Sequence, residues 1–178
     1  FYRHRIKKAS FILRVYIFIV VPIKYLINLF YLEKKINLDS YKNNSPELFK
    51  KDLNYLFEYF NSDKGEFFNN QYLQPAKKNK EKIQAHGYAK FYEPIFINFK
   101  NKEVNILELG SFYGNSAAAL YFYFNKASIF TTDINPDMFK YKSYRVTNNY
   151  TDSSSRNSIM NNLSQFMSKN CNLDEIIK

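Results

Sequence analysis

The residues best suited to chemistry lie at the ends of three segments in the second half of the chain. Glu108 and Gly110 close the first segment, Asp133 closes the second, and Asp152 follows the third. Apolar, β-branched runs that stop at glycine or at an acidic residue predict buried parallel strands. Open α/β sheets bind nucleotide-sized ligands at the carboxyl ends of such strands. We therefore expect these side chains to gather at one edge of a sheet.

The turn after the first strand indicates which ligand. Gly110 and Gly114 are present, but Phe112 occupies the place of the second glycine in a dinucleotide-binding turn. That glycine lets the backbone approach a pyrophosphate, so Phe112 argues against NAD and FAD. A phosphate-binding G-x-x-x-x-G-K-[ST] loop is also absent from the sequence. Glu108 before a glycine turn suits a ligand with an ammonium and a sulfonium, such as S-adenosylmethionine.

The second strand supports this interpretation. Asp133 lies about 20 positions beyond the glycine turn, where doubly wound folds place an acidic residue on the ribose hydroxyls. A carboxylate accepts hydrogen bonds from both hydroxyls of a cis-diol. The spacing thus predicts a ribose contact at Asp133.

These motifs resemble those of class I S-adenosylmethionine-dependent methyltransferases. Glu108-Leu-Gly110 is similar to the first motif of that family and Thr132-Asp-Ile134 to the second. Residues 150–159 resemble the G-D-Q-S-D-R-like loop of macrolide-sugar O-methyltransferases and their cephalosporin-hydroxylase-like relatives, although Ser155 replaces the second aspartate. The resemblance implies the following cofactor-binding residues: Glu108, Gly110, Ser111, Tyr113 and Gly114 at the methionine end, Asp133 and Ile134 at the ribose, and Asp152 and Ser153 at the adenine.

An upstream segment extends the resemblance. Residues 62–65 (Ser-Asp-Lys-Gly) and 86–93 are similar to the D-K-G…H-x-Y…Y-E segment of the same group, with a Lys- and Asn-rich insertion at 66–84 between them. The resemblance implies that residues 86–93 close over the site. Alternatively, His86 is structural or solvated, and Tyr88 and Tyr92, four residues apart, form one packed helical face.

The acidic residues also have structural interpretations. Glu108 can cap the following helix, Asp133 before Asn-Pro can form a turn, and Asp152 among serines can be an ordinary loop or N-cap residue. The paired spacing of Glu108 and Asp133, each after a strand, favours the ligand-binding interpretation.

The expected fold is α/β: a truncated Rossmann-like, doubly wound sheet with three strands and the start of a fourth at 172–178, preceded by N-terminal helices. Three regions are predicted: a basic, apolar helix over 1–36, a helical cap over 37–100 and a partial cofactor-binding domain over 101–178. We interpret the 178-residue chain as an N-terminal fragment, inactive by itself. The resemblance implies that the catalytic base and Mg²⁺ ligands lie beyond residue 178, so we name no catalytic or metal-binding residue.

The N-terminal 36 residues hold much of the net charge of +10. Basic residues at 3–35 flank and interrupt the apolar stretch 9–32, with the cations on about a third of a helix circumference. That pattern favours a helix lying in an anionic membrane interface, with Pro22 kinking it. A packing or dimer helix, which would give a homo-oligomer, and a spanning anchor remain alternatives. Nucleic-acid binding is disfavoured, because the cations alternate with long aliphatic side chains.

Two shorter predictions concern the cap region. Steps of three and four between apolar residues predict one helix over 46–60 with Ser45 as N-cap. The Lys-rich stretch 74–84 is best interpreted as a solvated face. The single cysteine, Cys171, allows no internal disulfide and fits a cytoplasmic protein. Together with the N-terminal helix, this predicts a protein that is peripheral at the inner membrane face.

The function expected from the resemblance is O-methylation of a sugar or glycan-like metabolite with S-adenosylmethionine as donor. Lipid-linked saccharides would suit a membrane-associated N-terminus. Alternatives are a hydroxylase-like or non-catalytic cofactor-binding member of the same fold, since fold does not fix function, and a membrane-associated interaction module.

Overall fold

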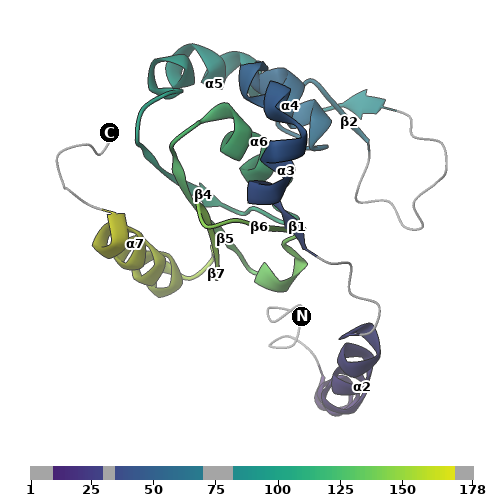
Figure 1. Cartoon of the computed structure of the whole chain (residues 1–178). Coiled ribbons are helices and arrows are strands. Elements are labelled where there is room, and N and C mark those ends of the chain that lie inside the picture. Colours follow the sequence, from purple (N-terminus) through teal and green to yellow (C-terminus); the bar gives the residue numbers. More distant parts are fainter. Residues whose placement is uncertain (1–9, 30–34, 70–81, 171–178) are drawn as a thin grey trace.

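The computed structural model describes residues 10–29, 35–69 and 82–170 (Figure 1). Within them the chain is a mixed α/β protein with parallel strands, which confirms the predicted class. The predictions for Cys171, for the strand opening at 172–178, for the cations at 3–8 and for most of the 74–84 stretch fall outside these residues.

A three-stranded parallel sheet forms the centre of the second half. Its strands are β4 (Asn105–Leu109), β5 (Ser128–Asp133) and β7 (Val146–Tyr150), in the order β4-β5-β7. Leu109 pairs with Thr132, and Asp133 pairs with Tyr150. The central strand β5 is buried from Ile129 to Thr132, as expected for a parallel strand covered on both faces. The register places the carboxyl ends of all three strands at one edge.

Helix α6 (Asn115–Tyr123) is buried on all sides and links the sheet to the helices of the cap region. Its first half, Ala117 to Ala119, is small and permits close packing, whereas its second half is aromatic. The Phe122 ring lies 5.4 Å from Phe60 and 5.1 Å from Phe49, centroid to centroid. The cap region and the sheet region therefore share one hydrophobic core.

The prediction of one continuous helix over 46–60 is wrong, because the segment forms two separate elements. A 3-10 helix, η1 (Pro46–Lys50), is followed by α4 (Leu53–Tyr59). Asp52 begins the second helix by accepting a hydrogen bond from the Tyr55 N–H at 2.7 Å, whereas Ser45 makes no side-chain cap bond. The predicted apolar face is nonetheless buried, with Leu53 and its neighbours on α4 in the shared core.

Contacts between distant segments close the cap onto the sheet region. Strand β1 (Ile36–Asn37) pairs in parallel with β6 (Tyr141–Lys142). Beside it, the Asp39 carboxylate accepts hydrogen bonds from the Tyr121 hydroxyl at 2.9 Å, the Ser143 hydroxyl at 2.8 Å and the Tyr144 N–H at 3.0 Å.

The remaining elements of the body are α3 (Leu38–Asn44), the hairpin β2 (Phe67–Asn69) and β3 (Lys82–Gln84), α5 (Ala89–Phe96), η2 (Ile97–Phe99), η3 (Pro136–Met138) and α7 (Arg156–Asn170).

Helix α2 (Phe11–Leu29) includes Pro22 and stands apart from the α/β body in Figure 1. Large apolar side chains are exposed around it: Phe11 by 81%, Ile12 by 81% and Phe18 by 85%. Among the described residues, no helix combines the length and apolar character needed to cross a membrane.

Two glycines of the turn after β4 provide a matched test of the packing. Gly110 and Gly114 have φ of 82° and 80°, and a Cβ at Gly114 would clash with the Phe139 ring, whereas at Gly110 nothing lies within 4 Å. Gly110→Ala should destabilise by about 1 kcal/mol through the left-handed backbone alone. Gly114→Ala should add about 1–3 kcal/mol for overpacking. Urea unfolding measures both, and equal losses would contradict the described contact with Phe139.

Candidate functional site

The turn 110–114 at the carboxyl end of β4 is held in an unusual backbone conformation. Gly110, Phe112 and Gly114 all have positive φ, and that of Phe112 is 48°. The N–H groups of Gly110 and Ser111 both donate to the Thr132 carbonyl, at 2.8 and 3.0 Å. The turn is thereby fixed on the end of β5. A left-handed conformation costs a non-glycine residue about 1–2 kcal/mol, so Phe112 requires a compensating contact.

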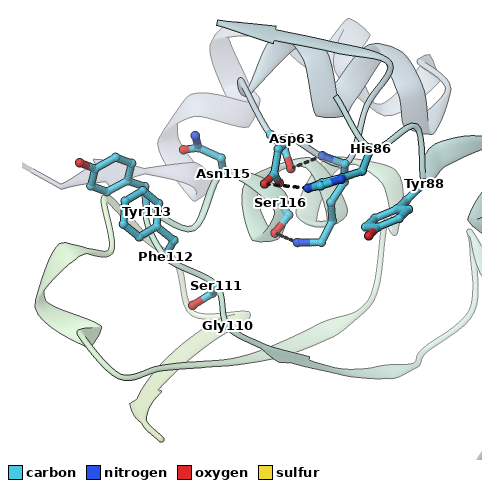
Figure 2. Close-up of a pocket in the computed structure, with 11 residues that line it drawn as sticks. Asp63, His86, Tyr88, Gly110, Ser111, Phe112, Tyr113, Asn115 and Ser116 are labelled. Atoms are coloured by element: carbon cyan, nitrogen blue, oxygen red, sulfur yellow. Dashed lines mark hydrogen bonds and ion pairs between the residues drawn. The ribbon is translucent and has the colours of Figure 1, made fainter. Parts of the chain in front are cut away.

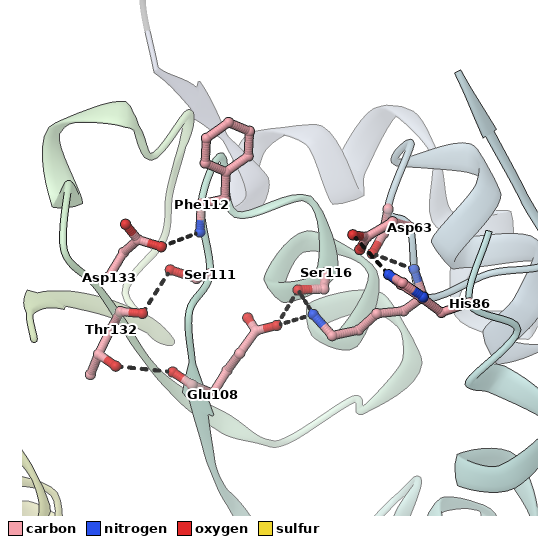
Figure 3. A network of polar contacts seen from close by, with 10 residues as sticks. Asp63, His86, Glu108, Ser111, Phe112, Ser116, Thr132 and Asp133 are labelled. Atoms are coloured by element: carbon pink, nitrogen blue, oxygen red, sulfur yellow. Dashed lines mark hydrogen bonds and ion pairs between the residues drawn. The ribbon is translucent and has the colours of Figure 1, made fainter. Parts of the chain in front are cut away.

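Asp133 supplies that contact. Its Oδ2 accepts a hydrogen bond from the Phe112 N–H at 2.7 Å (Figure 3). Its Oδ1 accepts one from the Asn135 N–H at 2.8 Å. The predicted turn-forming role of Asp133 is therefore confirmed. Each carboxylate oxygen has two lone pairs, so the same group retains capacity for ligand hydroxyls. The predicted ribose contact stays a prediction.

Glu108 lies at the base of the turn in a buried polar cluster. Its Oε1 accepts hydrogen bonds from the Ser116 hydroxyl and from Lys64 Nζ, the latter at 2.7 Å, and Lys64 Nζ also contacts Ser116 Oγ at 3.1 Å (Figure 3). The Glu108 side chain is only 8% exposed. Its Oε2 is buried and has no hydrogen-bond partner within the described part of the chain. Ser116 stands in the first turn of α6, so Glu108 does contact the start of that helix.

The cluster is an ion pair that bridges the cap and the sheet. Burial by itself lowers the pKa of Lys64, but the charge of Glu108 and its hydrogen bond outweigh burial and raise that pKa above its ordinary value of 10.5. Lys64 therefore stays protonated at neutral pH. Sequence reasoning placed Lys64 in the motif at 62–65 but did not name it as a site residue. No spacing rule linked it to Glu108, which is 44 positions away.

A cavity of about 190 Å³ opens beside this cluster (Figure 2). Figure 2 shows Phe112 and Tyr113 on one side of it and His86 and Tyr88 on the other. The cavity lining consists of residues 62–64, 86, 88, 110–113, 115 and 116. Of the predicted site residues, the structure thus brings Gly110, Ser111 and Tyr113 to one cavity, with Glu108 behind it. Gly114 is buried against Phe139 instead.

The predicted closing segment 86–93 divides into two parts. His86 lines the cavity with its Nε2 3.7 Å from Asp63 Oδ2 and its ring 5.1 Å from the Tyr88 ring. Glu93 instead accepts hydrogen bonds from the Leu53 N–H at 2.6 Å and the Tyr123 hydroxyl at 3.0 Å, and so stabilises the start of α4. The Tyr88 and Tyr92 rings lie 5.9 Å apart, but only Tyr92 packs against the core, whereas Tyr88 is exposed and lines the cavity. The alternative of one packed face therefore holds for Tyr92 alone.

Asp152 follows β7 and organises the turn before α7. Its Oδ1 accepts hydrogen bonds from the Ser154 N–H at 3.0 Å and the Ser154 hydroxyl at 2.6 Å, and its N–H donates to Ser158 Oγ at 2.9 Å. Asp152, the exposed Ser153 and the half-buried Ile134 do not line the cavity. Asp152 thus has the loop role of the structural alternative and does not cap α7, which begins at Arg156. Its predicted adenine contact stays a prediction.

Within residues 10–29, 35–69 and 82–170, no group of three or more His, Cys, Asp and Glu side chains could hold a metal ion. Comparison of the chain with protein-family models, with curated proteins and with solved structures found no match.

The ion pair makes a stability prediction. Lys64→Met leaves Glu108 buried without its counter-charge and should cost about 3 kcal/mol, whereas Lys64→Met with Glu108→Gln should cost much less. Lys82→Met, which removes an exposed 3.1 Å pair with Glu58, should cost less than about 1 kcal/mol. Chemical unfolding at pH 7 compares the three variants. A Lys64→Met loss as small as that of Lys82→Met would contradict the buried ion pair.

The same pair predicts a pH dependence. Because the folded-state pKa of Lys64 is above its ordinary value, its contribution to stability is complete below about pH 10.5 and is lost as pH rises through the folded value. The stability gap between the wild type and Lys64→Met should therefore narrow as the pH rises above about 10.5.

Proposed function

We propose that this chain is a class I S-adenosylmethionine-dependent methyltransferase, or the cofactor-binding region of one, with a Rossmann-like sheet. The observation that carries the proposal is the placement of Glu108, Asp133 and Asp152 at or just beyond the carboxyl ends of three adjacent parallel strands, β4, β5 and β7. Methionine end, ribose and adenine would then bind in that order along one sheet edge, as ligands of open α/β sheets do.

The backbone of the turn supports this choice over a dinucleotide. Phe112 occupies the position that a pyrophosphate approaches, and its N–H is already bonded to Asp133. The position thus offers a side chain of substantial bulk and lacks the free donor that a phosphate needs. A buried carboxylate with an unpartnered oxygen, Glu108, suits a cationic group at the next position.

In the proposed reaction, a hydroxyl oxygen of a sugar or glycan-like acceptor attacks the methyl carbon of the sulfonium. The carbon–sulfur bond breaks with its electron pair going to sulfur, and the hydroxyl proton passes to a base. Gly110, Ser111, Tyr113 and Gly114 shape the methionine end, Asp133 and Ile134 the ribose subsite, and Asp152 and Ser153 the adenine edge. Alignment of donor and acceptor would supply much of the rate enhancement, and a base or Mg²⁺ would activate the hydroxyl.

Cofactor binding tests the proposal. Calorimetry on the full 178-residue chain should show heat with S-adenosylhomocysteine and none with NAD⁺. Asp133→Asn should weaken binding at least about tenfold, because an amide supplies one acceptor oxygen in place of two, whereas the exposed Glu103→Gln should not change it. Absence of binding by the folded wild-type chain would reject the proposal.

We also propose that α2 lies in an anionic membrane interface, as the basic, apolar sequence of residues 3–35 predicts, with the protein peripheral at the inner membrane face. Exposure of Phe11, Ile12 and Phe18 on a helix that stands apart from the body favours this role, because burying such side chains at the lipid boundary removes apolar surface from water. Arg14 would reach anionic head groups.

Liposome co-sedimentation tests the membrane proposal. The chain should bind vesicles containing anionic lipid more tightly than neutral vesicles, and Phe18→Ser with Ile12→Ser should reduce binding at least about tenfold. Phe91→Ser, which changes a side chain 62% exposed on α5, serves as the control and should have no effect. A dimer that dissociates on the α2 substitutions without any vesicle binding would favour the dimer-helix alternative.

A further inference from the structure

Lys64 has a chemical capacity that its structural role does not use. Its ammonium carries three N–H donors, and the described contacts use two of them, on Glu108 and Ser116. Lys64 also lines the cavity, whereas Glu108 lies behind it. The cavity therefore presents a fixed cation at its wall, with its counter-charge on the far side.

Glu108, the counter-charge of Lys64, also has a carboxylate oxygen without a hydrogen-bond partner among the described residues. This oxygen, Oε2, is buried, and in Figure 3 it points away from Lys64, on the side of the turn. An unsatisfied buried acceptor costs about 1–3 kcal/mol, more if charged. The pair thus has one spare donor on its cation and one spare acceptor on its anion.

Of the two groups, the Lys64 ammonium is the one at the cavity wall, because Glu108 does not line the cavity. An α-amino-acid end carries a carboxylate, which accepts hydrogen bonds from an ammonium. The pair is rigid because each partner is held by Ser116 as well as by the other. The start of α6 adds partial positive charge beside the Lys64 ammonium, since its N-cap Gly114 offers no side-chain cap.

We propose that Lys64 is the residue that selects ligands carrying an α-amino-acid end, by binding the ligand carboxylate through its third N–H. This inference rests on the proposed function in one respect, because the amino-acid end it names is that of S-adenosylmethionine. It goes further by assigning the carboxylate to a residue from the cap turn at 62–65. The cofactor would then be bound by both the cap and the sheet.

The test compares two probes that differ only in the carboxylate. The full chain should bind S-adenosylhomocysteine about 10- to 100-fold more tightly than 5′-deoxy-5′-(3-aminopropylthio)adenosine, which lacks the carboxylate. Lys64→Met should bring the ratio of the two dissociation constants near one, because it weakens binding of S-adenosylhomocysteine alone. Lys64→Arg should keep most of the preference for S-adenosylhomocysteine. If Lys64→Met does not fold, the charge-balanced variant with Glu108→Gln replaces it and should also give a ratio near one.

Lys140→Met is the matched control, because Lys140 Nζ lies 4.2 Å from the centre of the Tyr113 ring but Lys140 does not line the cavity. Its ratio should equal that of the wild type. An unchanged ratio in Lys64→Met, or no discrimination by the wild type, would overturn the assignment.

A third arm separates this inference from the proposed function. Backbone NMR signals of residues 110–116 should shift with L-methionine and much less with L-methioninamide, whose carboxylate is masked. Shifts with L-methionine in a chain that binds neither nucleoside would reject the methyltransferase proposal and keep the amino-acid site. No response to any of the four probes would overturn both.

Discussion

The ion pair between Lys64 and Glu108 is the contact on which the architecture of the site depends. It joins a turn of the cap to the end of the first central strand, across 44 positions of sequence. A buried carboxylate without a cation is among the costliest groups a protein interior can hold. The cap turn and the sheet edge are therefore held together. The distance between them sets the width of the cavity that they line.

A second constraint acts through the backbone. The turn 110–114 has three residues at positive φ, one of them Phe112, and Asp133 holds it by accepting the Phe112 N–H. The carboxylate we assign to the ribose thus also shapes the turn we assign to the methionine end. Preorganisation of this kind reduces the ordering cost of binding, because the loop and the side chain are fixed before the ligand arrives.

Much of this arrangement could be predicted from local sequence. Strand ends at Glu108 and Asp133 follow from apolar runs and glycine, which are short-range signals. The break at Asp52 was missed, because the apolar steps of three and four continue across it while a capping side chain starts a new helix. The role of Lys64 was missed for a different reason. A pairing between residues 44 positions apart depends on tertiary packing, which no periodicity encodes.

The contacts of Asp39 have a consequence for how the chain is made. Its three hydrogen-bond donors are supplied by residues 121, 143 and 144, and the neighbouring strand β1 pairs with β6 at residues 141–142. On a ribosome, residues 36–39 emerge long before any of these partners exists. Since domains are synthesised from the N-terminus at about 5–20 residues per second, this segment waits several seconds unpaired. The first element of the body to leave the ribosome therefore cannot reach its final place until residues 141–144 have been synthesised.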